Sequence, residues 1–281
     1  MLGTLYIVAT PIGNLADITQ RAIQTLKDVD IIAAEDTRHT HKLLQHYGIN
    51  TKTTSYHEHN EQQRSEELLA RLREGNDVAI VSDAGTPGIN DPAFRLVRLA
   101  LDNNIPVVPV PGPSAFLAAL VASGLPTDEF FFAGFLPSRS GARRTRLNEL
   151  RSIASTLIFY EAPHRLRDAL EDALEVLGPR QAVVARELTK IHEEFRRGKL
   201  NELAEYYSNE QNVRGEIVLI IDRSRDEDKS SAAVTNTELQ RLVARLEDEG
   251  LDHRAALKKA ARELGMSRDE AYRRLTVARR Q

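Results

Sequence analysis

Short apolar runs alternate with amphipathic segments along the first 110 residues of the chain. The run V-A-I-V at residues 78–81 is unbroken, which is typical of a strand covered on both faces of a parallel sheet. The pattern predicts strands at residues 5–9, 30–34, 53–56, 78–81 and 105–110, and helices at residues 17–26, 39–47, 61–74 and 92–102. This alternation predicts a parallel, twisted sheet with right-handed crossovers. The prolines within residues 105–110 indicate an edge strand or a strand end.

Two prolines around a glycine interrupt this pattern. Pro111, Gly112 and Pro113 cannot continue a strand or a helix, so we place a domain boundary there. Beyond it, the pattern predicts helices at residues 114–123, 144–153, 165–177 and 200–207, and strands at residues 130–135, 156–160, 182–187 and 216–222. Residues 226–231 form a polar linker. We therefore expect α/β domains at residues 1–112 and 113–228, followed by a small helical domain at residues 229–281.

The C-terminal segment has a different character. Three helices are expected at residues 235–249, 252–264 and 267–280, and the turn before the last one is typical of a helix-turn-helix. Residues 235–281 contain 11 Lys/Arg and 8 Asp/Glu, which gives a local charge of +3. A solvated helical bundle and a contact with nucleic acid both fit this composition.

The overall composition narrows the classes of function. The chain has 38 Lys/Arg and 41 Asp/Glu, a net charge of −3, so any surface that attracts nucleic acid must be local. It contains no Cys, which excludes disulfides, thiolate nucleophiles and cysteine-bound metals and fits a reducing cytosol. The first residues do not resemble a signal peptide, and no apolar run approaches the ~18 residues that span a bilayer. We therefore expect a cytoplasmic protein with no membrane partner.

Four polar or glycine-rich loops follow the strands expected in the first half. They comprise residues 10–14, 35–38, 82–88 and 111–114. Because the carboxyl ends of parallel strands meet at one rim of a sheet, these loops form a candidate ligand site. Gly85 and Gly88 can adopt positive φ, and Asn90 or Asp91 can cap a helix that begins near Pro92. A tight turn without a ligand is the alternative interpretation.

Several common nucleotide and hydrolase motifs are missing from these loops. The chain lacks the patterns G-x-G-x-x-G, G-x-x-x-x-G-K-[ST] and G-x-S-x-G, which argues against NAD, ATP and a nucleophile elbow. A neutral or zwitterionic ligand held by backbone groups fits better. The motifs H-T-H at residues 39–41 and H-E-H at residues 57–59 have no third partner cluster. We therefore expect no metal there, but a polar rim or an RNA contact.

An arginine-rich segment is the second candidate for RNA contact. Arg139, Arg143, Arg144 and Arg146 place four arginines within eight residues, beside Gly and Ser. A solvated loop is one interpretation. We favour a flexible loop that contacts phosphate, since like charges concentrated in a loop attract a polyanion.

Six motifs resemble the tetrapyrrole-methylase superfamily. They are V-A-T-P-I-G-N-L-A-D-I-T (residues 8–19), A-E-D-T-R (34–38), S-D-A-G-T-P-G-I-N-D-P (82–92), P-G-P-S-A (111–115), Y-E-A-P-H-R (160–165) and A-R-E-L-T-K (185–190). Within the superfamily the chain is similar to the bacterial subfamily of ribosomal RNA small-subunit methyltransferases I, across residues 2–222 and also in the helical tail. One position differs, because Asn90 stands where Ser is expected.

The resemblance implies a class III methyltransferase, with two α/β domains, a cleft between them and a C-terminal helical domain. It implies S-adenosyl-L-methionine as the cofactor and a homodimer as the assembly. The implied acceptor is the ribose 2′-hydroxyl of a cytidine in the decoding region of 16S rRNA, within the small ribosomal subunit. Two alternatives remain: a small-molecule, tetrapyrrole-like methyltransferase of the same fold, and a non-catalytic RNA-binding module.

The resemblance also implies roles for individual residues. The cofactor site would comprise Pro11, Gly13, Asp83, Ala84, Gly85, Gly88, Ser114, Ala115 and Tyr160. The expected RNA contacts are Arg139, Arg143, Arg144 and Arg146, with Lys258, Lys259, Arg273 and Arg274 in the tail. The candidates for orienting or deprotonating the hydroxyl are Glu35, Asp36, Glu161, Glu187 and Lys190. Of these we select Glu187 and Lys190. The alternative is structural ion pairing, of Arg186 with Glu187 and of Glu35 with Arg38.

Overall fold

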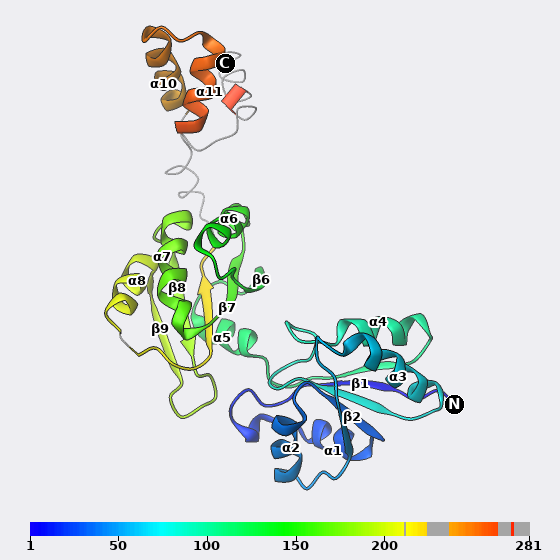
Figure 1. Ribbon diagram of the computed structural model, residues 1–281. Helices are drawn as coiled ribbons and strands as arrows, with labels where there is room; N and C mark the ends of the chain where they lie inside the picture. The colour runs from blue at the N-terminus through cyan, green and yellow to red at the C-terminus, as the bar shows by residue number, and fades with distance from the viewer. Residues whose placement is uncertain (211, 224–235, 264–270, 273–281) are drawn as a thin grey trace. The chain divides into compact units, whose positions relative to one another are not determined.

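The computed structural model describes residues 1–210, 212–223, 236–263 and 271–272. Contacts within the chain divide it into two compact units, Met1–Arg223 and Ser224–Gln281. The first unit contains two five-stranded sheets (Figure 1). The predicted three-part division, with boundaries at residues 112 and 228, stays a prediction, and the expected linker at residues 226–231 lies outside the described residues.

The first sheet is parallel throughout, as predicted. Its strands are β1 (Leu5–Val8), β2 (Ile31–Ala34), β3 (Lys52–Ser55), β4 (Val78–Val81) and β5 (Val107–Val110). They lie in the order β3-β2-β4-β1-β5, so the edge position expected for the proline-containing strand is confirmed. The apolar run of β4 lies at the centre of the sheet and all four of its residues are buried.

Helices cover both faces of the first sheet (Figure 1). On one face, α3 (Glu61–Arg73) and α4 (Phe94–Asp102) pack around Ile80 of β4. On the other face, α1 (Gln20–Asp28) and α2 (Thr37–His46) pack around its neighbour Ala79. Successive strand residues therefore enter two separate cores, which is why β4 is apolar at every position instead of alternating.

The second sheet is mixed. Its strands are β6 (Phe130–Phe135), β7 (Thr156–Glu161), β8 (Gln181–Arg186), β9 (Glu194–Lys199) and β10 (Ile217–Ile221), in the order β6-β7-β10-β8-β9. Of the pairs in this sheet, β6 and β7 are parallel and the other three are antiparallel.

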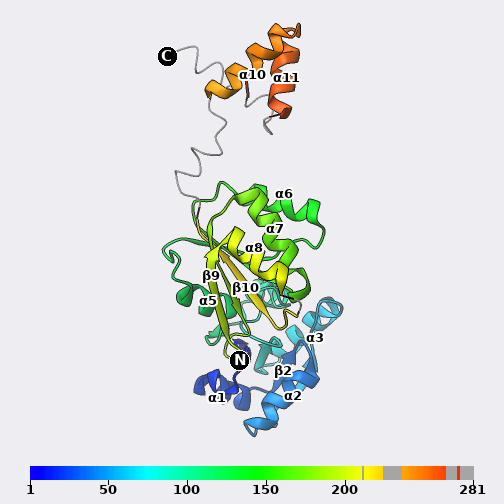
Figure 2. The same ribbon diagram turned by 90° about the vertical axis from the view of Figure 1, so that its left-hand side faces the viewer.

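Helices also cover both faces of the second sheet (Figure 2). The helix α5 (Ala115–Ser123) packs on one face. The other face is covered by α6 (Ser140–Leu150), α7 (Leu166–Leu177) and α8 (Leu200–Asn209). Ile12, from the loop after β1, belongs to the core beneath α5. A loop of the first sheet thus contributes a buried side chain to the core of the second sheet.

The structure corrects three expectations about local structure. The arginine-rich segment is not a loop, because residues 140–150 form α6. The edge strand β9 was missed because its sequence, E-F-R-R-G-K, has no apolar run. Neither Asn90 nor Asp91 caps α4, since the N-cap is Ala93 and no side chain makes a capping hydrogen bond there.

The C-terminal unit contains the first two predicted tail helices, α10 (Asn236–Asp248) and α11 (His253–Glu263). They share a small core that includes Leu239, Val243, Ala256 and Ala260. Of the third predicted helix and the helix-turn-helix, only residues 271–272 belong to the described part of the chain. In the described ranges, no helix is both long enough and apolar enough to cross a bilayer.

Candidate active site

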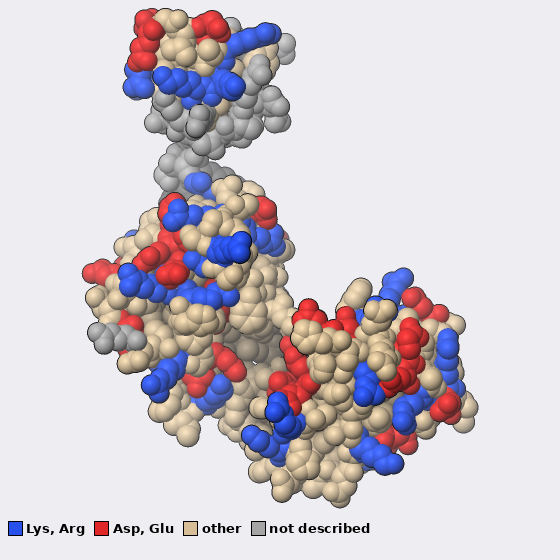
Figure 3. Space-filling model, in the orientation of Figure 1, with Lys and Arg blue, Asp and Glu red and all other residues tan. Residues whose placement is uncertain are grey.

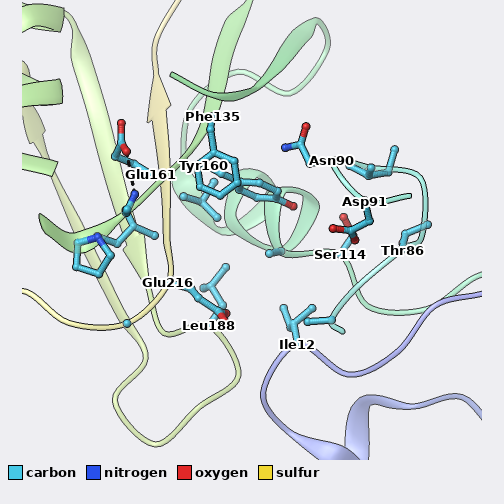
Figure 4. Close-up of a pocket in the computed structure, with 18 residues that line it drawn as sticks. Ile12, Thr86, Asn90, Asp91, Ser114, Phe135, Tyr160, Glu161, Leu188 and Glu216 are labelled. Atoms are coloured by element: carbon cyan, nitrogen blue, oxygen red, sulfur yellow. Dashed lines mark hydrogen bonds between the residues drawn. The ribbon is translucent and has the colours of Figure 1, made fainter. Parts of the chain in front are cut away.

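A cavity of about 380 Å³ opens between the two sheets of the first unit (Figure 4). The first sheet contributes Ile12 from the loop after β1 and, from the segment after β4, Ala84, Thr86, Ile89, Asn90 and Asp91. The second sheet contributes the ends of β6 and β7, the start of β10 and Leu188 from the loop after β8. Ser114 and Ala115, at the start of α5, lie between these two walls. The cavity therefore adjoins the carboxyl-end rim of the first sheet, where the sequence predicted a ligand site.

Hydrogen bonds hold the rim loops of the first sheet together. Thr10 and Gly85 exchange both backbone hydrogen bonds, at 2.9 and 3.0 Å, and Thr10 Oγ1 donates to the Ser82 carbonyl at 3.2 Å. Gly85 has φ 81°, which a residue with a side chain rarely adopts. Thr86 Oγ1 donates to the Pro113 carbonyl at 3.4 Å. The glycine loop is thus fixed to two other rim loops, and this arrangement presents Ala84 and Thr86 to the cavity.

Carboxylates gather behind and beside this wall. The Asp36 N–H donates to Asp83 Oδ1 at 3.0 Å, and the Asp83 N–H donates to Glu35 Oε2 at 3.4 Å. Asp91 lines the cavity itself and is half-buried. Burial, with the nearby charges of Glu35 and Asp83, raises the pKa of Asp91 to about 6. In Figure 3, the part of the molecule built on the first sheet carries acidic side chains along the edge that faces the second sheet.

The opposite wall is aromatic and apolar. Tyr160 lies between Phe132 and Phe135, with ring centroids 5.0 and 5.5 Å apart. Figure 4 shows the Tyr160 hydroxyl directed across the cavity toward Asp91 and Ser114. Burial raises the pKa of Tyr160 to about 12, so its hydroxyl stays protonated at neutral pH. This wall can stack against a flat ring and donate one hydrogen bond.

The predicted catalytic pair forms an ion-pair cluster at the edge of the cavity. Lys190 Nζ lies 2.9 Å from Glu187 Oε1 and 3.3 Å from Glu216 Oε2, and the Glu216 N–H donates to Glu187 Oε1. The hydrogen bond from Lys190 lowers the pKa of Glu187. Burial lowers the pKa of Lys190, but its two carboxylate partners outweigh burial and raise it overall. Of these three residues, Glu216 lines the cavity.

The loop after β8 also contacts the first sheet directly. The Asn14 N–H donates to Thr189 Oγ1 at 3.0 Å. A Cβ atom at Gly13 would lie 2.5 Å from Lys190 Cγ and 2.9 Å from Thr189 Oγ1. Gly13, predicted at the floor of the site, therefore lies at a point where two loops meet without room for a side chain.

Glu161 contributes backbone rather than carboxylate to the cavity. Its side chain is fully buried, and Oε1 accepts from the Ala162 N–H at 2.9 Å and lies 3.3 Å from Arg165 Nε. Figure 4 shows this carboxyl group turned away from Asp91 and Ser114. Burial raises the pKa of Glu161. These contacts fit a structural role for Glu161 better than a role in catalysis.

The predicted cofactor residues divide into two groups. Ala84, Ser114, Ala115 and Tyr160 line the cavity. The remainder lie in the loops that support it and do not line it; they are Pro11, Gly13, Asp83, Gly85 and Gly88. The sequence analysis missed Asp91, Phe135 and Glu216 as cavity residues. Asp91 was in a motif already under consideration, but the local pattern suggested a helix cap.

The predicted RNA contacts are less uniform than the sequence suggested. Arg143 is 1% exposed and pairs with Asp172 at 2.7 Å, so the expectation that it contacts RNA is wrong: burial removes it from the surface. Arg144 is half-exposed and also pairs with Asp172. Arg139, Lys258 and Lys259 are exposed, and Arg146 is partly buried. Arg273 and Arg274 lie outside the described residues.

No metal-binding cluster is found in the described ranges, where no three His, Asp or Glu side chains are grouped closely enough to hold an ion. His57, from the H-E-H motif, instead has Nε2 3.1 Å from Asn60 Nδ2. Its ring also packs edge-on against His59, with centroids 6.0 Å apart.

Comparison with known proteins agrees with the resemblance. Residues 4–204 match the family model of tetrapyrrole (corrin/porphyrin) methylases. The ribosomal RNA small subunit methyltransferase I of Micromonospora olivasterospora is 48% identical, over 98% of this chain and 87% of the relative. The enzyme of that name from Escherichia coli O157:H7 is 53% identical, over 83% of this chain and 82% of the relative.

Solved structures show the same fold at lower identity. A uroporphyrin-III C-methyltransferase from Thermus thermophilus, complexed with S-adenosylhomocysteine, aligns with a TM-score of 0.55 at 22% identity and covers 78% of this chain and 97% of its own. A diphthine synthase aligns with a TM-score of 0.62 at 14% identity and covers 82% of this chain and 94% of its own.

Proposed function

The chain belongs to the family of tetrapyrrole (corrin/porphyrin) methylases, and from this premise we propose that it methylates the ribose 2′-hydroxyl of a cytidine in the decoding region of 16S ribosomal RNA. The methyl donor is S-adenosylmethionine. The observation that carries the choice of an RNA substrate is the 48% identity to a ribosomal RNA small subunit methyltransferase I over 98% of this chain, the C-terminal helices included. A small-molecule methylase would not need those helices.

The cavity fits this methyl donor. Its volume of about 380 Å³ lies within the range of small-ligand sites. Tyr160 and Phe135 offer flat aromatic surface for a base, and the backbone of residues 84–91 offers polar groups for an amino-acid moiety. The lining contains carboxylates but, in the part of the chain that the structure describes, no Lys or Arg. A lining with carboxylates and without basic side chains suits a ligand that carries the positive charge of a sulfonium.

The chain's own residues then have distinct tasks. When bound, the donor supplies a methyl group that is activated by the positive charge of its sulfonium. The 2′-oxygen attacks the carbon of this methyl group. The protein must therefore position the hydroxyl, whose proton passes to water as the new carbon–oxygen bond forms, and positioning supplies much of the acceleration. Lys190 is held cationic by Glu187 and Glu216, so it can orient the hydroxyl oxygen but cannot take its proton. Orientation is therefore the task that we assign to the Glu187–Lys190 pair.

The proposal is tested by methyl transfer to small ribosomal subunits that lack the modification, compared with naked 16S rRNA and with a tetrapyrrole. We expect 2′-O-methylcytidine in the digested rRNA. Transfer to the tetrapyrrole alone would favour the alternative function. Ala115→Leu, which extends into the cavity, should abolish transfer. Ala70→Leu, at an exposed position of α3, is the matched control and should leave it unchanged.

We also propose that the protein acts in the cytoplasm as a homodimer. The helix α5 is apolar on nearly every side, yet Leu117 and Val121 are 44% and 74% exposed. An exposed apolar patch of this kind is typical of an interface. Sedimentation should give a dimer for the wild type and a monomer for Val121→Asp.

A further inference from the structure

Asp91 is the carboxylate of the cavity wall that has no basic partner. Three acidic residues line the cavity: Asp91, Glu161 and Glu216. The Glu161 side chain lies beside Arg165, and Glu216 lies 3.3 Å from Lys190. Among the described residues, no Lys or Arg forms an ion pair with Asp91. A half-buried carboxylate without a cation in a ligand cavity implies that the ligand brings the cation.

The groups around Asp91 make its surroundings more negative. On the first sheet these groups are Glu35 and Asp83, while a side-chain hydrogen bond with Ser82 acts in the opposite direction on the pKa of Asp91. Across the cavity lie the carboxylate of Glu216 and the uncharged hydroxyl of Tyr160. Arg38, in a rim loop of the same sheet, is bound to Asp36 at 2.8 Å. Burial raises the pKa of Asp91 to about 6, and the charges of Glu35 and Asp83 act in the same direction. The ionised form is therefore costly in the empty cavity, and a bound cation would relieve that cost.

We propose that Asp91 makes the cavity distinguish the cationic methyl donor from its neutral product, because its carboxylate attracts the sulfonium and loses that attraction once the methyl group has left. This inference rests on the proposed function, since it assumes that S-adenosylmethionine occupies the cavity. The reaction removes one positive charge from the ligand: the 2′-oxygen forms a bond to the methyl carbon as the carbon–sulfur bond breaks, and the electron pair of that bond stays on sulfur. A thioether remains, and the hydroxyl proton passes to water. A fixed carboxylate near that sulfur therefore binds the donor more tightly than the product.

This preference would assist turnover. A cavity that recognised only the adenosine and the amino-acid group would hold S-adenosylhomocysteine as firmly as the donor, and the product would then inhibit the next cycle. With Asp91 in the wall, the loss of charge weakens binding at the step after which the product must leave. Asp91 thereby becomes a specificity-determining residue, distinct from the Glu187–Lys190 pair.

The test is calorimetric titration of S-adenosylmethionine and S-adenosylhomocysteine into the wild type, Asp91→Asn, Asp91→Glu and Asp102→Asn. Asp102 undergoes the same chemical change at an exposed position at the end of α4, so it serves as the matched control. In Asp91→Asn we expect donor affinity to fall about tenfold or more while product affinity changes less than twofold. Asp91→Glu should retain a preference for the donor, and Asp102→Asn should match the wild type.

A pH series on the wild type gives an independent measurement should Asp91→Asn fold poorly. Donor affinity should fall about tenfold between pH 7 and pH 5 as Asp91 becomes protonated, whereas product affinity should stay constant. Equal losses for both ligands, or an unchanged ratio in Asp91→Asn, would overturn the inference and leave the proposed function standing. If neither ligand bound the wild type, the proposed function itself would fail.

Discussion

The backbone N–H of Asn14 donates a 3.0 Å hydrogen bond to Oγ1 of Thr189 and thereby joins a loop of the first sheet to a loop of the second. The receiving loop is strained, since Glu187 and Thr189 have φ values of 52° and 64°. Non-glycine residues adopt such values at a cost, and only where surrounding contacts enforce them. The loop that carries Lys190 is therefore shaped by its contact with the first sheet.

Gly13→Ala tests this contact. The new Cβ would lie 2.5 Å from Lys190 Cγ and 2.9 Å from Thr189 Oγ1, so the two loops must separate. We expect methyl transfer to fall at least tenfold while the protein stays folded, because a shift of about 1 Å at a reacting centre is enough for such a loss. Gly141→Ala is the control, since no atom lies within 4 Å of its added Cβ. Equal activity of both variants would show that the contact does not shape the site.

Lys190 variants separate orientation from proton transfer. The cluster with Glu187 and Glu216 raises the pKa of Lys190, so the ammonium persists as pH rises through the neutral range. Lys190→Ala should lower kcat about 10- to 100-fold with little change in donor affinity. Lys190→Arg should recover part of the rate because it keeps the charge. A pH–rate profile that loses a limb near neutrality in Lys190→Ala would instead identify Lys190 as a base.

The parts of the fold that the sequence predicted well are those determined by neighbouring residues. The strand β4 has the predicted bounds, Val78–Val81, because four consecutive apolar residues suit only a strand covered on both faces. The glycine loop after it was located for the same local reason. Ala84, Ser114 and Tyr160 were then placed at the cavity by the motifs that contain them.

The parts that were missed depend on distant residues. The segment around Arg143 forms a helix in which that arginine binds Asp172, 29 residues farther along the chain. Asp91 resembled a helix cap in its own sequence, and only burial in the folded cavity, beside the charge of Glu35, gives it an altered pKa. No local pattern encodes either arrangement, because partners this far apart meet only in the folded chain.

Replacing Arg143 by Ala should lower the free energy of unfolding much more than replacing Arg146 by Ala. The side chain of Arg143 is 2% exposed and bound to Asp172, so its removal leaves a buried carboxylate whose remaining ionic partner, among the described residues, is Arg144. We expect the free energy of unfolding to fall by about 3 kcal/mol. Arg146 is 39% exposed, and its loss should cost roughly 0.5 kcal/mol or less. Urea unfolding measures both values. Similar losses of stability in the two variants would contradict the assignment of Arg143 as a buried structural residue and Arg146 as a surface residue.

Asp91→Asn should stabilise the free protein at neutral pH. Burial in the folded state raises the pKa of Asp91 from its ordinary value of 3.8 to about 6, so folding favours the protonated form and that contribution is lost as pH rises through 6. The ionised side chain then costs roughly 3 kcal/mol at pH 7.5 and roughly 0.5 kcal/mol at pH 4. Thermal unfolding at both pH values should show a gain for Asp91→Asn at pH 7.5 that nearly disappears at pH 4. A gain independent of pH would mean that the charge is not its cause.

Lys258 and Lys259 offer a direct measure of RNA contact by the C-terminal unit. Both are exposed on α11, while Ala256, Leu257 and Ala260 of the same helix are buried in the core with α10. Replacing both lysines by Gln should therefore spare the fold. If they contact phosphate, RNA affinity falls and the slope of log K against log salt becomes less steep by about 1 for each lysine. Lys27→Gln, at an exposed lysine near the end of α1, is the control. An unchanged salt slope in the double variant would show that this face of α11 does not touch the RNA.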